Sequence, residues 1–179
     1  MLLAAVAVGF MLASETNSQA VFAYDAVKAI LNGETPQLPE TKTASHGVFI
    51  TIESKGKILA CRGALEATEP TLEQEILSTA RSACQFDPRY HQVRIDPNKS
   101  FNVTLTIVRR QEAIDSVRTL LPKDGLVLRS PSGVGIVLPW EGRDPDTRLS
   151  WAYRKAKTPE GTPVSLKRLI ADRYRYPEP

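Results

Sequence analysis

Two cysteines and one charged turn are the residues of this chain whose types and spacing could do chemistry. Cys61 lies in the apolar run Ile58–Leu65, two residues before Gly63, and Cys84 directly precedes the segment Gln85–Tyr90, which reads QFDPRY. A thiolate is a strong nucleophile, and an arginine guanidinium can bind a carboxylate or phosphate through two parallel hydrogen bonds. These residues therefore indicate thiol chemistry or anion binding as candidate functions.

Cys61 needs a partner to become a nucleophile, because a positive charge or a base must raise its thiolate fraction. The neighbouring Arg62 points to the opposite face of the predicted strand, since successive side chains alternate. Activation is therefore expected from a residue that is distant in the sequence, such as His46, His91 or Arg89.

Three interpretations of Cys61 remain open from the sequence. The first is a small apolar core residue beside Gly63, a glycine that gives room for close backbone packing. The second is a functional thiol acting as a catalytic nucleophile. The third is a disulfide with Cys84, which an oxidising compartment would favour.

The turn Asp87-Pro88-Arg89 has two interpretations. It stops the preceding helix and pins the loop through local hydrogen bonds, or it projects Arg89 toward an anionic ligand with bidentate geometry. In the second case we expect a site in which Cys61 is catalytic and Gly63, Asp87 and Arg89 bind the ligand. We expect Cys61 and Arg89 to converge at the mouth of one crevice.

Composition limits the other classes of function. The chain has 179 residues, 42% of them hydrophobic, and a formal net charge of +3, which is typical of a globular domain and lower than in a dedicated nucleic-acid binder. The two histidines and two cysteines show no zinc or haem spacing, so no metal site is predicted, and no cofactor is indicated. Basic and aromatic residues concentrate in 143–176, which indicates a solvated face or, as a weaker alternative, nucleic-acid binding.

The N-terminus carries an uncharged apolar run from Leu2 to Ala13, followed by polar residues. This run is too short to span a bilayer, but it has the length of a signal-peptide core. We predict that residues 1–23 are a signal peptide or apolar leader, with cleavage after Ala20 or Ala23 and export of the remainder. A buried N-terminal helix in a cytoplasmic protein and a misassigned start codon are the alternatives.

Hydrophobic periodicity predicts a single α+β domain over residues 24–179, with a mainly antiparallel sheet built from hairpins and flanked by helices. Thr71 and Gln74 have the spacing of a capping box, and Asp144-Pro145 is a helix start. The segment 165–176 fits either a helix or a strand. Helices are predicted over 23–31, 71–86 and from 144 to before 159, and strands over 48–53, 58–65, 101–107, 126–129 and 134–138.

Five segments occur in the order and spacing of the AMMECR domain family, so residues 24–176 resemble that family. The segments are GVFITIESKGKILACRGALEATEP, a helix, SACQFDPRY, FNVTLTIV and KDGLVLRSPSGVGIVLP. The family hallmark Leu-Arg-Gly-Cys-Ile-Gly falls on Ile58–Gly63 and keeps Cys61 and Gly63. Leu59, Ala60 and Arg62 depart from it.

The resemblance implies an α+β fold with an antiparallel sheet and no established reaction. In prokaryotes such domains resemble the A component of a three-part system with a Memo-like protein and a radical-SAM protein. The function that we expect is therefore binding of a small ligand or protein partner near Cys61 and Arg89. The alternative is an enzyme or redox component that uses Cys61 as its nucleophile, within such a modification system.

Overall fold

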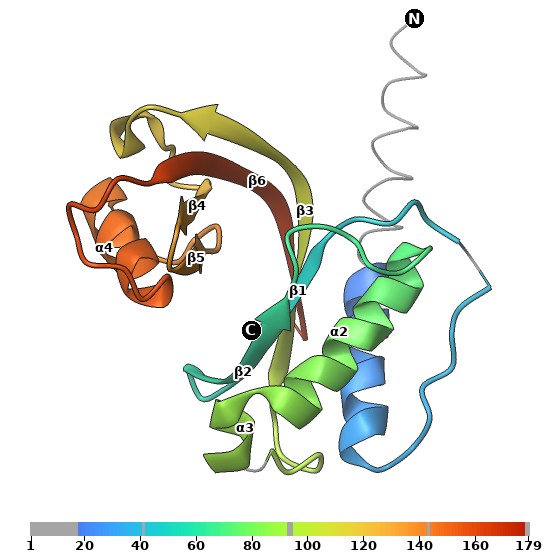
Figure 1. The fold of residues 1–179 in the computed structure, drawn as a ribbon. Coiled ribbons are helices and arrows are strands. Elements are labelled where there is room, and N and C mark those ends of the chain that lie inside the picture. The colour runs from blue at the N-terminus through green and yellow to red at the C-terminus, as the bar shows by residue number, and fades with distance from the viewer. Residues whose placement is uncertain (1–17, 41, 93–94, 143, 178–179) are drawn as a thin grey trace, which may run out of the picture. The chain divides into compact units, whose positions relative to one another are not determined.

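The structure is a computed structural model that describes residues 18–40, 42–92, 95–142 and 144–177, except for the side chains of residues 91 and 92. Its sheet has six strands in the order β2-β1-β3-β6-β4-β5 (Figure 1). The first helix covers residues 18–31. The other elements are β1 (Val48–Ser54), β2 (Lys57–Gly63), α2 (Leu72–Phe86), α3 (Pro88–Gln92), β3 (Asn102–Ile114), the short 3₁₀ helix η1 (Val117–Thr119), β4 (Gly125–Ser130), β5 (Gly133–Val137), α4 (Pro145–Lys155) and β6 (Ser165–Tyr176).

The residues pack as two compact units, and β3 and β6 each contribute to both. The first unit holds the described residues up to Ile107 together with those from Arg173 on, and the second holds Val108–Asp172. None of the described helices is long and apolar enough to cross a membrane.

In the first unit, β1 pairs with β2 on one side and with β3 on the other, in both cases antiparallel. The turn between β1 and β2 consists of Lys55 and Gly56, which both have positive φ angles, of 49° and 73°. Positive φ at both central residues suits the right-handed twist of a two-residue hairpin. In the order of the sheet, β2 has β1 as its one neighbouring strand, so β2 is an edge strand.

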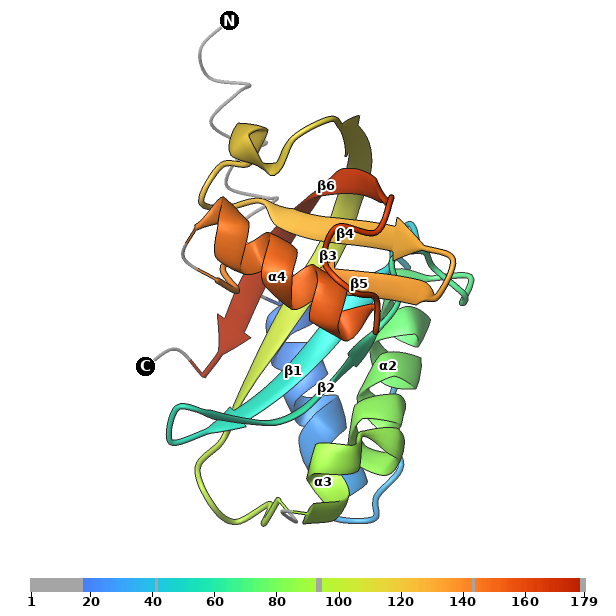
Figure 2. The same cartoon turned by 60° about the vertical axis from the view of Figure 1, so that its left-hand side comes forward.

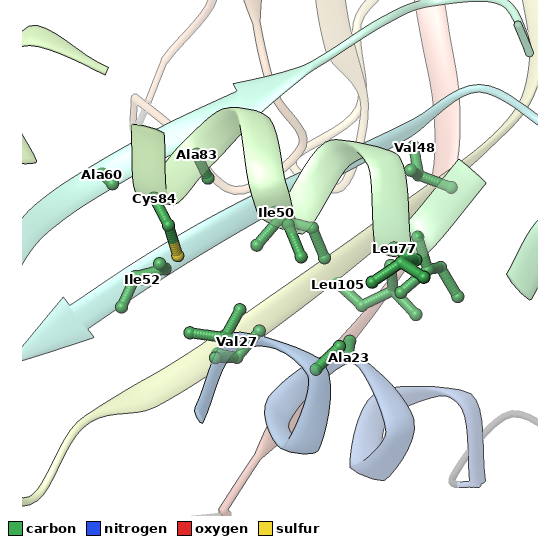
Figure 3. Close-up of a cluster of buried hydrophobic side chains, with 14 of the residues drawn as sticks. Ala23, Val27, Val48, Ile50, Ile52, Ala60, Leu77, Ala83, Cys84 and Leu105 are labelled. Atoms are coloured by element: carbon green, nitrogen blue, oxygen red, sulfur yellow. The ribbon is translucent and has the colours of Figure 1, made fainter. Parts of the chain in front are cut away.

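The core of the first unit lies between one sheet face and two helices. Figure 3 shows Ala23 and Val27 of the first helix pointing toward Ile50 and Ile52 of β1, and Cys84 reaching the same cluster from α2. Thr71 caps α2, because its hydroxyl accepts from the Gln74 N–H at 3.3 Å; the hydroxyl also donates to the Gln74 side chain at 3.0 Å, in place of the backbone bond that would complete a capping box. Burial of these apolar side chains stabilises the unit.

The second unit has a core of its own, in which α4 packs on β4 and β5 (Figure 2). Asp144 caps this helix by accepting from the Thr147 N–H at 2.9 Å, and Pro145 follows at the start. Gly135 of β5 lies against the helix so closely that a Cβ there would meet the Ala152 carbonyl at 1.9 Å. This position therefore requires glycine.

The fold confirms the prediction of an α+β protein with a mainly antiparallel sheet built from hairpins. Two predicted boundaries differ clearly, and one ambiguous segment is resolved. The first helix already includes residue 18, so both predicted cleavage points, after Ala20 and after Ala23, lie within it. Both alanines are buried, at 2% and 0% exposure. β3 runs on to Ile114, and the ambiguous segment Ser165–Tyr176 is a strand. Export and the single-domain assignment stay predictions.

Candidate functional site

The candidate site lies where the edge strand β2 meets Asp87, which ends α2, and Arg89 of the short helix α3; the sequence predicts a turn in place of this helix. The backbone N–H of Cys61 donates to Asp87 Oδ2 at 2.9 Å, and the Cys61 carbonyl accepts from Arg89 Nη2 at 3.3 Å. Edge strands leave backbone groups without a strand partner. Asp87 and Arg89 together supply the hydrogen bonds that a further strand would make at this residue.

The sequence builds the junction of α2 and α3 through local hydrogen bonds. Asp87 is the C-cap of α2, and its Oδ1 accepts from the Arg89 N–H at 2.8 Å and from Arg89 Nε at 3.0 Å. The Arg62 side chain donates to the Phe86 carbonyl at the end of the same helix, where a cation is favourable. The interpretation of Asp87-Pro88-Arg89 as a helix stop pinned by local bonds therefore describes part of what the structure contains.

Asp87 and Arg89 form an asymmetric ion pair. Arg89 Nη2 lies 2.7 Å from Asp87 Oδ2, and the Asp87 side chain is 2% exposed whereas that of Arg89 is 48% exposed. Burial raises the pKa of Asp87. This effect is outweighed by hydrogen bonds from the Arg89 side chain and from the N–H groups of Cys61 and Arg89, together with the attraction of the guanidinium, so the pKa falls to about 2. The carboxylate is therefore charged at neutral pH and fixes the orientation of the guanidinium.

The Cys61 thiol lies beside this pair. Its Sγ accepts a hydrogen bond from the Thr51 hydroxyl at 3.3 Å, and the residue is half-buried. The pKa of Arg89 is raised first by its hydrogen bond to Asp87 and, to a smaller extent, by the nearby Cys61 side chain. The sequence suggested His46, His91 and Arg89 as residues that could activate the thiol. Among the described side chains, Arg89 is the one shown to lie near the Cys61 side chain. The side chain of His91 lies outside the described part.

Gly63 has a packing role in this structure. A Cβ at this position would meet the Val48 carbonyl oxygen at 2.2 Å and the Phe49 ring at 2.5 Å. Gly63 is therefore required by the approach of β1. Its predicted part in ligand binding stays a prediction.

Cys84 differs from Cys61 in every respect that matters for reactivity. It is 3% exposed and packs in the first core, and burial raises the pKa of its thiol to about 12. Ala60 shares that core, so the adjacent Cys61 points to the other sheet face. Both cysteines are thiols in the structure, which therefore does not contain the disulfide of the third interpretation.

Some basic residues of the second unit are paired with acids. Arg168 lies 3.3 Å from Asp124, and Lys155 lies 2.7 Å from Glu141. Further pairs join Arg109 to Asp172 and Arg118 to Asp146. Both interpretations of the basic face 143–176, solvated or nucleic-acid binding, stay predictions.

Sequence reasoning missed Thr51 as a neighbour of the thiol. The strand pattern gave the face on which each side chain lies, but the partner across the hairpin depends on register. The register pairs Thr51 with Cys61 and shifts between Ile52 and Glu53. A two-residue turn at Lys55-Gly56 could have predicted the residue pairs next to the turn. The register shift between Ile52 and Glu53 would still have made the predicted partner of Thr51 wrong.

These features define an α+β protein with a half-buried thiol and a locked guanidinium at one sheet edge. The chain belongs to the AMMECR1 family, which it matches over residues 18–177. Its fold is similar to that of the uncharacterised protein PH0010 from Pyrococcus horikoshii, with a TM-score of 0.78 and 19% identity over 91% of this chain and 92% of that one.

Relatives in other organisms are similar over part of their length. A protein from Methanosarcina acetivorans is 32% identical over 62% of this chain, and the match spans 61% of its own length. A protein from Thermotoga maritima is 31% identical over 72% of this chain and 77% of its own length. Family membership confirms the resemblance seen in the sequence, and it establishes no ligand, partner or reaction.

Proposed function

We propose that the chain binds a small ligand that carries a carboxylate or phosphate group, at the edge of β2. The anionic group would accept hydrogen bonds from Arg89, and the rest of the ligand would contact Cys61. The observation that carries this proposal is the locked, half-exposed guanidinium of Arg89 beside the half-buried thiol.

The geometry of Arg89 suits it for this role. Within the part of the chain that the structure describes, its hydrogen bonds use Nε and Nη2, which leaves Nη1 to donate to a ligand. A side chain that is already fixed loses little conformational entropy when a ligand binds. Because Asp87 neutralises the net charge of the pair, we expect selectivity for anions to be modest and to depend on directed hydrogen bonds.

Two alkylating reagents of similar size test the proposal, because iodoacetate is an anion and iodoacetamide is neutral. The measurement is the ratio of their rates at Cys61, determined by peptide mass spectrometry. A lone unit charge about 6 Å away in a largely aqueous setting is worth about 0.7 kcal/mol, and Asp87 offsets part of it, so we expect the ratio to exceed that of a small free thiol by less than about threefold.

Arg89→Gln should lower the ratio to the free-thiol value or below it, because the Asp87 carboxylate then has no guanidinium to offset it. Arg81→Gln is the matched control, because it removes the same charge from an exposed position on α2. It should leave the ratio unchanged. An unchanged ratio in Arg89→Gln, or an equal loss in Arg81→Gln, would contradict binding of anions at Arg89.

A second candidate function is thiol chemistry at Cys61, and the hydrogen bond from the Thr51 hydroxyl to Sγ favours it. Such a donor stabilises a thiolate, as does the neighbouring guanidinium. The rate of iodoacetamide labelling as a function of pH tests this candidate. Thr51→Val should reduce the rate at neutral pH severalfold if the thiolate is the working form, and an unchanged pH profile would remove the candidate.

Association with a Memo-like protein and a radical-SAM protein is a proposal that rests on the family alone. Its test is whether purified partners of these two kinds from the same organism bind this chain. Cys61→Ser should weaken that binding if the thiol lies in the contact. Absence of binding would remove the modification-system setting and leave ligand binding to be judged by the alkylation ratio.

A further inference from the structure

A groove lies between α2 and the loop that follows the first helix. Its volume is about 860 Å³, which is within the range of small-molecule sites. One wall is α2, the other is the loop segment 35–38, and Glu69 also lines the space. All of these residues belong to the first unit. We call this feature the α2 groove.

The helical wall of the α2 groove is a single stripe of side chains. It runs from Gln74 through Ser78, Arg81, Ser82 and Gln85 to Phe86. Residues three or four apart lie on the same side of a helix, so these side chains form one continuous surface. At 1.5 Å per residue the stripe is about 18 Å long, which suits an elongated ligand better than a compact one.

The polar side chains of the α2 groove are available to a ligand. Within the part of the chain that the structure describes, the side chains of Ser78, Ser82 and Gln85 make no hydrogen bond, and neither does that of Gln37 in the loop. A serine hydroxyl and a glutamine amide can each donate and accept. The groups that match them best are hydroxyls, because a hydroxyl also does both.

The charges in the lining cancel. Arg81 supplies one positive charge and Glu69 one negative charge, and the loop residues 35–38 supply none. A ligand with a net charge is attracted to one of these groups and repelled by the other, and it loses more hydration than a neutral ligand does. The α2 groove therefore favours neutral polar ligands, in contrast to the anion site proposed at Arg89.

Two exposed apolar side chains complete the lining. Phe86 is 64% exposed and Leu38 is 46% exposed. Sugar rings carry C–H groups on their faces and hydroxyls around their edges, so their faces pack against an aromatic ring while their edges form hydrogen bonds. The α2 groove offers both kinds of contact in one elongated space.

We propose that the α2 groove binds a neutral oligosaccharide. One sugar ring packs against Phe86, and hydroxyls of the chain form hydrogen bonds with Ser78, Ser82 and Gln85. The proposal is independent of the proposed function, because neither Cys61 nor Arg89 lines the α2 groove.

Nuclear magnetic resonance titration of the full, nitrogen-15-labelled chain tests the proposal. The probes are maltotriose, cellotriose and triacetylchitotriose, which are neutral trisaccharides with different linkages or substituents. Trigalacturonate at equal ionic strength is the charged control. We expect at least one neutral probe to shift the backbone signals of residues 74–86 and 35–38 in a saturable way. Trigalacturonate should bind severalfold more weakly than the neutral probe that binds best.

Three variants locate the binding. Phe86→Ala should weaken the affinity for the best neutral probe about fivefold, because the contact with the ring is lost. Ser78→Ala should weaken it twofold or more, since one hydrogen bond is removed, by the estimate of about 1 kcal/mol or less for an exposed bond. Leu121→Ala is the matched control, because Leu121 is 50% exposed and lies in the second unit, and it should leave the affinity unchanged.

Several outcomes would overturn the proposal. They are no saturable shift with any neutral probe, shifts centred outside the α2 groove, equal affinities of Phe86→Ala and the unaltered protein, or equal affinities for trigalacturonate and the neutral probes. The iodoacetate-to-iodoacetamide ratio at Cys61 should be the same in Phe86→Ala as in the unaltered protein. Failure of this proposal is therefore distinguishable from failure of the Arg89 site.

Discussion

Asp87 makes a testable contribution to stability, because its carboxylate receives hydrogen bonds from Cys61 and Arg89 while almost wholly buried. Its pKa falls from 3.8 to about 2 in the folded protein. Each pKa unit corresponds to about 1.4 kcal/mol, so the ionised form stabilises the fold by about 2.5 kcal/mol. We predict that Asp87→Asn lowers the free energy of unfolding by about this amount or more, because an amide nitrogen will also face a donor.

The loss should depend on pH in a defined direction. A depressed pKa contributes stability above the pKa of the unfolded state, near 3.8, and the contribution disappears as the pH falls through about 2. The difference between the unaltered protein and Asp87→Asn should therefore be constant from pH 5 to pH 7. It should shrink between pH 5 and pH 2.

Urea unfolding monitored by circular dichroism at several pH values measures this difference. Asp25→Asn is the control, because Asp25 is exposed on the first helix and its loss should change stability by less than about 0.5 kcal/mol. The reasoning fails if Asp87→Asn costs no more than Asp25→Asn at pH 7. It also fails if the difference between Asp87→Asn and the unaltered protein does not change with pH.

Three further predictions concern packing. Gly63→Ala should unfold at a markedly lower temperature than Gly56→Ala, because a Cβ at Gly63 would meet the Val48 carbonyl oxygen at 2.2 Å. At Gly56 nothing lies within 4 Å, and an alanine there costs only about 1 kcal/mol for its positive φ. Equal thermal midpoints of the two variants would contradict this. Arg148→Met should cost about 2–3 kcal/mol in urea unfolding, because two carbonyls lose buried donors; a change under 0.5 kcal/mol would be inconsistent with that role. A chain that begins at residue 24 should melt below one that begins at residue 18, because Ala20 and Ala23 are buried; equal melting would show that the first turns of the helix add nothing.

The elements were predictable where one local signal decided them. The helix cap at Thr71 and the start at Asp144-Pro145 each satisfy backbone N–H groups within one turn, so the sequence pattern was sufficient. The segment Ser165–Tyr176 was not predictable in this way. Its strand state depends on pairing with β4, which is distant in the sequence.

The site was predictable only in part, for the same physical reason. The residue types at Cys61, Asp87 and Arg89 suggested one site, and the structure brings all three together. The sequence did not indicate that Asp87 and Arg89 bind the backbone of the edge strand rather than project away from it. Nor did it reveal that Thr51 lies opposite Cys61, since that pairing depends on the register of β1 and β2.

The central claim is that the sulfur of Cys61 is an accessible thiol next to Arg89 while the sulfur of Cys84 is sealed in the core. Brief labelling of the native protein with iodoacetamide at pH 8, followed by peptide mapping of both cysteines, tests it most directly. We predict labelling at Cys61 and none at Cys84 until the protein is unfolded, because burial keeps the Cys84 thiol protonated. Equal labelling of both cysteines, or a Cys61 as unreactive as Cys84, would contradict the account.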